Sequence, residues 1–169
     1  MLIFKFILLI SIIVVSTLLG ILFSKKYSRR ESELKDIKSA LNMFSTKIKF
    51  TYEPIPNLFL EISNKIGGNI GKIFERASVR MKEESAGEAW NKSFEDVVTN
   101  LLDEDITTLK NLGRLLGQTD LEGQISEIEV VNQFLDTQLE NARQEKLKNE
   151  KMYRTLGIIS GMTIAIILI

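Results

Sequence analysis

Residues 6–23 read FILLISIIVVSTLLGILF and contain no charged side chain. As an α-helix this run would be about 27 Å long, close to the roughly 30 Å thickness of the hydrocarbon core of a bilayer. A cleavable signal peptide is the alternative, but the run is long for a signal sequence and no small-residue cleavage site follows it. We therefore predict that residues 1–24 form an uncleaved transmembrane helix.

Basic residues are unevenly distributed around this run. Only Lys5 and the terminal amine precede it, whereas four cations follow it: Lys25, Lys26, Arg29 and Arg30. Because basic segments are retained in the cytoplasm, this asymmetry predicts that the amino terminus is outside and the middle of the chain is inside. The same four charges can pair with anionic headgroups, so membrane lipid is an expected partner.

The opposite end of the chain is also apolar. Residues 156–169 carry no charge, but as a helix they would be only about 21 Å long. Residues 152–169, with Arg154 extended towards the headgroups, reach about 27 Å and are predicted to form a second transmembrane helix. Lys151 and Arg154 favour a cytoplasmic near side, which places the carboxy terminus outside as well. The alternative is a segment that lies in the membrane interface.

Two glycines, Gly157 and Gly161, are four residues apart in this C-terminal segment. Small residues at this spacing allow a second helix to approach closely. The alternative is that both glycines merely face lipid, where the same pair would be tolerated.

The section between the two ends, residues 25–151, has helical periodicity throughout. Its apolar residues recur at steps of three and four, and Pro54 and Pro56 interrupt the pattern once. We predict an all-α fold, an antiparallel helical bundle whose first and last long helices continue into the transmembrane segments. The residues predicted to face its core are Leu34, Ile37, Leu41, Phe44, Ile48, Leu58, Phe59, Ile62, Ile66, Ile70, Ile73, Phe74, Ala77, Ala89, Trp90, Phe94, Val97, Leu101, Ile106, Leu109, Leu112, Leu116, Ile125, Ile128, Leu135, Leu139 and Ala142.

A capping-box pattern predicts one helix start inside this body. Ser85 and Glu88 have the S-x-x-E spacing, in which the two side chains can satisfy free backbone amides. The apolar stripe that follows predicts a helix up to Leu101. Trp90 lies on this stripe, so we expect a core residue rather than a ligand platform.

The next helix is predicted to begin at the acidic residues 103–105, where negative charge suits the helix dipole. Gly113 and Gly117 are predicted to shape the turn that follows, with Gly117 as the stop. Asp120 is then expected to cap the last helix.

Composition argues against catalysis. The chain has no histidine and no cysteine, which removes the usual general base and the commonest transition-metal ligands. The acidic residues 103–105 do not have calcium-loop spacing, and residues 67–72 lack the spacing of a phosphate loop. The 22 basic and 22 acidic side chains leave no net charge, which gives no support to nucleic-acid binding. We expect neither an enzyme nor a bound metal or cofactor.

Several short motifs together resemble the stage III sporulation protein AB family. The residues that carry this resemblance extend over most of the chain: Pro56 in the turn 52–58, Ala89, Trp90, Gly113, Leu116, Gly117, Asp120, Gln124, Lys151, Met152, Tyr153, Arg154, Leu156, Gly157 and Gly161. The family belongs to spore-forming Firmicutes, and its soluble part is similar to the cytoplasmic domain of the type II secretion platform protein F.

This resemblance implies a function in sporulation. It suggests a mother-cell protein of the outer forespore membrane, in a secretion-like channel complex between mother cell and forespore. The expected partners are a cytoplasmic ATPase that resembles stage III sporulation protein AA and the other membrane proteins of the complex. Assembly of this chain with further copies of itself, as a homo-oligomer, is a further alternative.

The residues and the resemblance favour a non-enzymatic platform subunit that couples the ATPase to membrane components. The alternative is a membrane-tethered regulator or adaptor that binds a soluble partner.

Overall fold

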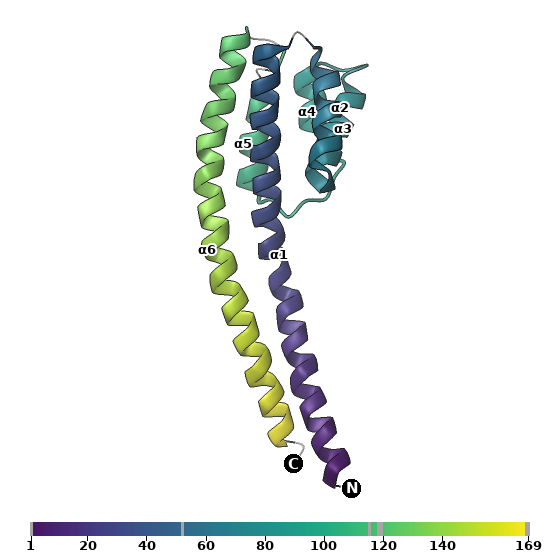
Figure 1. The fold of residues 1–169 in the computed structure, drawn as a ribbon, viewed down its shortest axis with the longest axis vertical. Helices are drawn as coiled ribbons and strands as arrows, with labels where there is room; N and C mark the ends of the chain where they lie inside the picture. Colours follow the sequence, from purple (N-terminus) through teal and green to yellow (C-terminus); the bar gives the residue numbers. More distant parts are fainter. Residues whose placement is uncertain (1, 52, 115, 118–119, 168–169) are drawn as a thin grey trace. The chain divides into compact units, whose positions relative to one another are not determined.

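The computed structural model describes residues 2–51, 53–114, 116–117 and 120–167, and the side chains from residue 10 onwards. Within these residues the chain is all-α, as predicted, with six helices and no strand (Figure 1). The helices are α1 (Leu2–Phe50), α2 (Ile55–Ile66), α3 (Gly68–Arg80), α4 (Ala86–Ser93), α5 (Asp103–Leu112) and α6 (Leu121–Ile167). Tyr52 of the predicted turn and the last two residues of the predicted tail lie outside the described part.

The chain divides into two compact units. One consists of Met1–Glu31 together with Asn141–Ile169, and the other of Ser32–Glu140. The long helices α1 and α6 contribute residues to both units, whereas α2 to α5 belong to the second unit alone.

The predicted long helices are confirmed. Helix α1 continues without interruption to Phe50, beyond the end of its apolar run, and α6 extends from Leu121 to Ile167. Pro54 stands at the N-cap of α2 with an extended backbone, φ −59° and ψ 141°. Because proline disfavours helix in the residue before it and has no amide proton, the chain turns here rather than extending α1.

Aromatic side chains form the centre of the second unit. The ring centroid of Phe59 lies 5.6 Å from that of Trp90, and the ring centroid of Phe74 lies 5.1 Å from it. The Trp90 side chain is fully buried, and its Nε1 donates a hydrogen bond to the carbonyl of Leu109 at 2.7 Å. A buried indole needs such a partner. Trp90 is therefore a core residue, as predicted.

The predicted helix to Leu101 is wrong, because α4 ends at Ser93. Beyond it, Glu33 of α1 accepts hydrogen bonds from the backbone amide of Asn100 at 2.5 Å and from its side-chain amide at 2.9 Å. The same carboxylate accepts from Asn69 of α3 at 2.8 Å. A buried carboxylate needs several donors, and here the non-helical segment supplies two of the three.

The stop predicted at Gly117 is also misplaced, because α5 ends at Leu112. Helix α4 packs against this end so closely that a Cβ on Gly87 would lie 2.2 Å from the carbonyl oxygen of Gly113. Gly117 has φ +73°, a left-handed conformation that favours glycine, in the turn after the helix.

Candidate functional site

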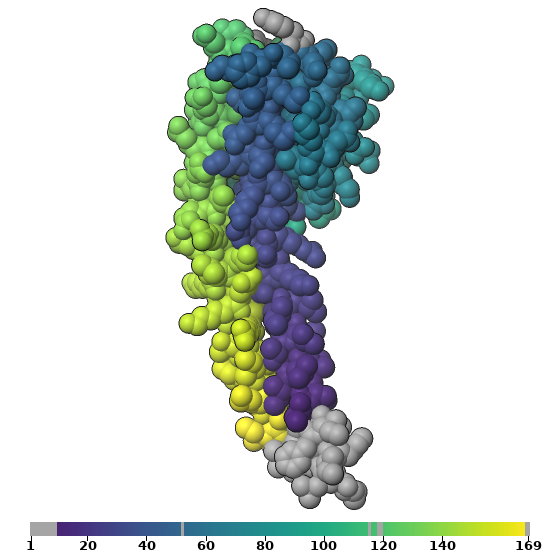
Figure 2. Space-filling model, viewed as in Figure 1, coloured from purple at the N-terminus to yellow at the C-terminus, as the bar shows by residue number. Residues whose placement is uncertain are grey.

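The first unit is a helical hairpin formed by parts of α1 and α6. Ser16 lies beside Gly157 and Arg30 lies beside Glu145, so the residue number rises along one helix as it falls along the other. The two segments are therefore antiparallel and lie against each other, as the purple part of α1 and the yellow part of α6 show in Figures 1 and 2. This hairpin contains all six residues for which a membrane-topology function was predicted.

Glycines bring the two helices into backbone contact. A Cβ on Gly157 would lie 2.8 Å from the carbonyl oxygen of Ser16, and one on Gly161 would lie 2.9 Å from the Cα of Ile13. A Cβ on Gly20 would lie 2.4 Å from the carbonyl oxygen of Tyr153. The helix that approaches Gly157 and Gly161 is therefore α1 of the same chain. Gly20 was not predicted to be a packing residue, although it is the lone glycine in the first apolar run.

Hydroxyl groups add polar contacts to this interface. The Oγ of Ser16 donates to the carbonyl oxygen of Gly157 at 2.8 Å, and it lies 2.8 Å from the Oγ of Ser160. Interhelical hydrogen bonds between small residues stabilise helix pairs in an apolar environment. Ser16 and Ser160 were not singled out from the sequence, because a serine in an apolar run usually bonds within its own helix.

The outer face of α1 in the hairpin is apolar and exposed. Among the described residues one helix, over Ile10–Phe50, is long and apolar enough to cross a membrane by length and composition. Within the hairpin, the large apolar side chains of α1 that are at least 40% exposed are Ile10, Val14, Val15, Leu18, Leu19, Ile21, Leu22 and Phe23. Helix α6 does not meet the same test within its described residues, which is consistent with the short uncharged length that follows Arg154.

Ion pairs join the two helices just beyond this apolar face. Arg30 Nη1 lies 3.0 Å from Glu145 Oε2, and Lys146 Nζ lies 3.0 Å from Glu31 Oε2. The hydrogen bond from Lys146 to Glu31 raises the pKa of this lysine above its usual value. Arg30 is only 4% exposed. Arg30 is therefore buried and paired with an acidic residue of α6 within the hairpin.

The other five predicted topology residues are exposed. Lys25, Lys26 and Arg29 project from α1, and Lys151 and Arg154 from α6. The Lys26 ammonium lies 5.0 Å from the centre of the Tyr27 ring, a cation–π contact. Both helices of the hairpin thus carry exposed cations next to their uncharged segments.

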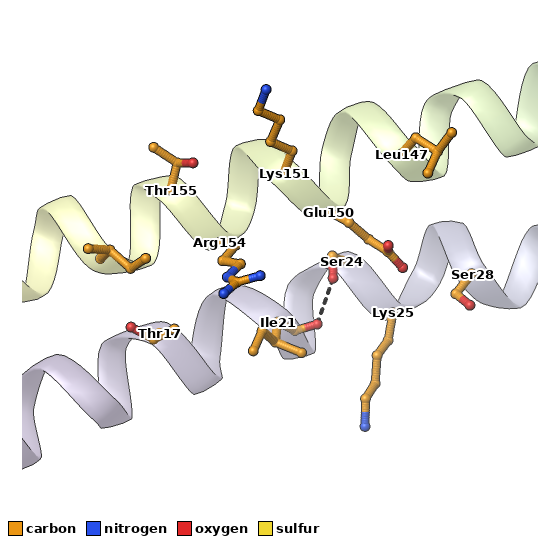
Figure 3. Close-up of a pocket in the computed structure, with 11 residues that line it drawn as sticks. Thr17, Ile21, Ser24, Lys25, Ser28, Leu147, Glu150, Lys151, Arg154 and Thr155 are labelled. Carbon is orange, nitrogen blue, oxygen red and sulfur yellow. Dashed lines mark hydrogen bonds between the residues drawn. The ribbon is translucent and has the colours of Figure 1, made fainter.

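Between these helices lies an open groove with a volume of about 860 Å³ (Figure 3). Cationic, hydroxyl and apolar side chains line it, together with one carboxylate. The lining residues are Thr17, Ile21, Ser24, Lys25, Ser28, Leu147, Glu150, Lys151, Arg154, Thr155 and Ile158. A groove of this composition suits an amphipathic anion better than a purely polar or purely apolar ligand.

The predicted packing and turn residues of the second unit have structural positions. Ser85 Oγ accepts from the backbone amide of Glu88 at 3.4 Å and donates to its carboxylate at 2.9 Å. Asp120 Oδ1 accepts from the backbone amide of Gly123 at 2.9 Å, the bond of a helix cap. Trp90, Gly113 and Gly117 serve the packing and the turn described above. Among the described residues, no group of three or more acidic, histidine or cysteine side chains could hold a metal ion.

Comparison with known proteins identifies the family. The family model of stage III sporulation protein AB matches residues 5–169. Stage III sporulation protein AB of Bacillus subtilis (strain 168) is 26% identical over 161 residues, which are 93% of this chain and 94% of the relative. A solved structure of a stage III sporulation protein AB, 21% identical, has the same fold with a TM-score of 0.65 and covers 70% of this chain and 96% of its own. The chain belongs to the stage III sporulation protein AB family.

Proposed function

We propose that the protein is a non-enzymatic platform subunit of a secretion-like complex between mother cell and forespore. It would couple a cytoplasmic ATPase to membrane components during sporulation. The family supports the sporulation function. The observation that favours a platform is the continuity of α1 and α6, each of which passes from the apolar hairpin into the charged unit without a break.

The hairpin is the part that we place in the membrane. The exposed apolar face of α1 would contact lipid, and the exposed cations would lie in the headgroup region on the cytoplasmic side. In this topology both termini lie outside and the unit Ser32–Glu140 is cytoplasmic. Residues 152–169 would cross the bilayer as the second helix of the hairpin.

The contacts with α1 explain how so short a C-terminal segment would insert. Its backbone packs on α1 at Gly157 and Gly161, and Ser16 bonds to the carbonyl of Gly157. These contacts compensate for the small number of apolar residues after Arg154. A Gly157→Leu/Gly161→Leu variant would separate the helices, and we expect it to prevent crossing. A control, Ile159→Ala/Met162→Ala, removes apolar area at two exposed positions of the same segment.

Crossing is measured by labelling a cysteine added after residue 169 with an impermeant maleimide in intact cells. Labelling in the control and its loss in the double-leucine variant support the hairpin topology. Equal labelling of both variants contradicts the dependence on α1. No labelling of the otherwise unchanged chain contradicts the crossing itself.

Helix continuity is the basis of the proposed coupling, because a rigid helix can transmit a displacement and a flexible linker cannot. Leu147 and Lys148 are exposed on α6 close to the hairpin's ion pairs. Replacing both with glycine weakens the helix by about 1 kcal/mol per residue relative to alanine. We expect Leu147→Gly/Lys148→Gly to reduce sporulation strongly and the matched Leu147→Ala/Lys148→Ala to sporulate normally. Normal spore counts in both strains would contradict rod coupling.

The proposed partners are an ATPase that resembles stage III sporulation protein AA and other membrane proteins of the complex. Affinity purification of the tagged full chain from sporulating cells, followed by mass spectrometry, tests this. Recovery of a secretion-type ATPase with membrane proteins supports the platform. Recovery of a soluble kinase or transcription factor in their place would instead indicate the regulator or adaptor.

A further inference from the structure

The groove of Figure 3 has no function in the coupling proposed above. It lies where uncharged sequence gives way to charged sequence on both helices, at Ser24–Lys25 of α1 and at Arg154–Thr155 of α6. The apolar residues Ile21 and Ile158 line the part of the groove on the uncharged side of this boundary. If the hairpin is embedded in a bilayer, one groove therefore contacts both acyl chains and headgroups.

The charged side chains of the groove suit a phosphate diester. Arg154 extends from α6 towards α1, whereas Lys25 and Lys151 extend outwards from their own helices. A lysine has a flexible four-carbon stem, so both ammonium groups can turn over a bound group. A guanidinium offers paired donors to phosphate oxygens, and lysines add charge. Neither Lys25 nor Lys151 nor Arg154 is buried, so no other group has to be displaced to make room for the ligand.

Glu150 restricts which phosphate compound fits. Its carboxylate reaches towards α1 in the same groove. It would repel a second phosphate but would accept hydrogen bonds from hydroxyl groups. Three cations and this one carboxylate give the groove a net charge of +2, which favours an anionic lipid over a zwitterionic one.

We propose that this groove binds the headgroup of one anionic glycerophospholipid of the phosphatidylglycerol class. The phosphate lies against Arg154, Lys25 and Lys151, and the glycerol hydroxyls donate to Glu150. The upper part of an acyl chain lies against Ile21 and Ile158. This inference rests on the membrane placement of the hairpin in the proposed function, but not on the coupling to an ATPase.

Native mass spectrometry of the full chain in detergent micelles tests the proposal. Dioleoyl phosphatidylglycerol, phosphatidylethanolamine and phosphatidylcholine are added in turn, and the retained lipid is counted. The variant Lys25→Gln/Arg154→Gln removes two cations that line the groove. The matched control Lys26→Gln/Arg29→Gln removes two exposed cations of α1 that do not line it. Circular dichroism verifies that both variants remain helical.

We expect one retained phosphatidylglycerol per chain, about tenfold weaker retention in the groove variant, and little change in the control. Equal loss in the two variants would mean general electrostatic attraction and overturn the proposal. Equal retention of phosphatidylethanolamine or phosphatidylcholine would also overturn it.

A second variant separates the groove from its charge. Ser28→Trp fills the groove and leaves every cation in place, whereas Ser32→Trp puts the same ring on an exposed position of α1 outside the lining. Ser28→Trp should weaken retention of phosphatidylglycerol and Ser32→Trp should not. Glycerol 1-phosphate at millimolar concentration should not displace the lipid; displacement would assign the site to a soluble phosphate.

The outcomes distinguish this proposal from the proposed function. Loss of specific lipid binding with normal recovery of the ATPase contradicts the groove alone. Specific lipid binding without an ATPase contradicts the coupling alone. If the protein stays in solution without detergent, both membrane statements fail together.

Discussion

Arg30 of α1 donates a hydrogen bond to Glu145 of α6 at 3.0 Å, although the two residues are 115 positions apart. The arginine side chain is almost fully buried, whereas the glutamate side chain is 46% exposed. Loss of the ion pair should therefore affect the two charged side chains differently. Removing the glutamate leaves a buried cation, and removing the arginine leaves a carboxylate that water can still reach.

A double-mutant cycle measures this pair. We expect Arg30→Gln and Glu145→Gln to show a coupling of about 1–2 kcal/mol in the free energy of unfolding, because the bond is charged and partly shielded from water. Thermal or urea unfolding of the detergent-solubilised chain provides the values. A parallel cycle with Lys26→Gln and Glu145→Gln should give a coupling near zero. Similar coupling in both cycles would contradict a specific pair.

The Glu33 carboxylate should determine the order of the segment after α4. Glu33→Leu leaves the amide donors of Asn69 and Asn100 without their acceptor, at a cost of about 2–4 kcal/mol. Hydrogen exchange of the Asn100 amide should become faster. Glu33→Gln keeps one acceptor oxygen, so its effect should be intermediate. Unchanged exchange in Glu33→Leu would contradict the assignment.

Replacing Gly87 with alanine should destabilise the protein, which is the opposite of the usual effect of this substitution inside a helix. Alanine in place of glycine inside a helix normally stabilises by about 0.5–1 kcal/mol. At Gly87 the added Cβ would meet the carbonyl of Gly113, a backbone atom that cannot rotate away. We expect Gly87→Ala to destabilise the protein by about 1–3 kcal/mol in urea unfolding. Ser126→Ala, at an exposed position of α6, should change the stability little.

The ion pair between Lys47 of α1 and Glu61 of α2 should make the stability of the protein depend on pH in the acid range. Hydrogen bonds from Lys47 and then Lys65 lower the pKa of Glu61 below its usual value. A carboxylate with a lowered pKa in the folded state stabilises it above the unfolded pKa, and this stabilisation is lost as the pH falls through the folded pKa. Glu61→Gln should therefore flatten the fall in stability on acidification, measured by urea unfolding between pH 7 and pH 3. Glu83→Gln, at an exposed position, should retain the slope of the unchanged protein.

Helix content and most of the core could be predicted from the sequence. Apolar periodicity identified residues such as Leu34, Ile37 and Trp90, which are fully buried. Prolines 54 and 56 marked the end of α1 because their effect on the backbone is local. The end of α4 could not be predicted in this way. The stripe continues to Leu101, but the chain leaves the helix to reach a carboxylate on α1.

For the charged residues of the hairpin, too, one part could be predicted from the sequence and another could not. Their number and position beside the apolar runs were visible in the sequence, but which of them are paired was not. The structure pairs Glu145 and Lys146 across helices, with Arg30 and Glu31. Gly157 and Gly161 were likewise visible as a small-residue pair, but not as a contact with α1.

The sequence by itself determined the all-α class, the long first and last helices and the positions where charge begins, since these follow from local periodicity, proline and composition. Only the tertiary structure decided which helix faces Gly157, why Arg30 is buried and which groups line the groove. These features depend on residues more than a hundred positions apart, and such proximity arises only when the antiparallel segments of α1 and α6 pack together.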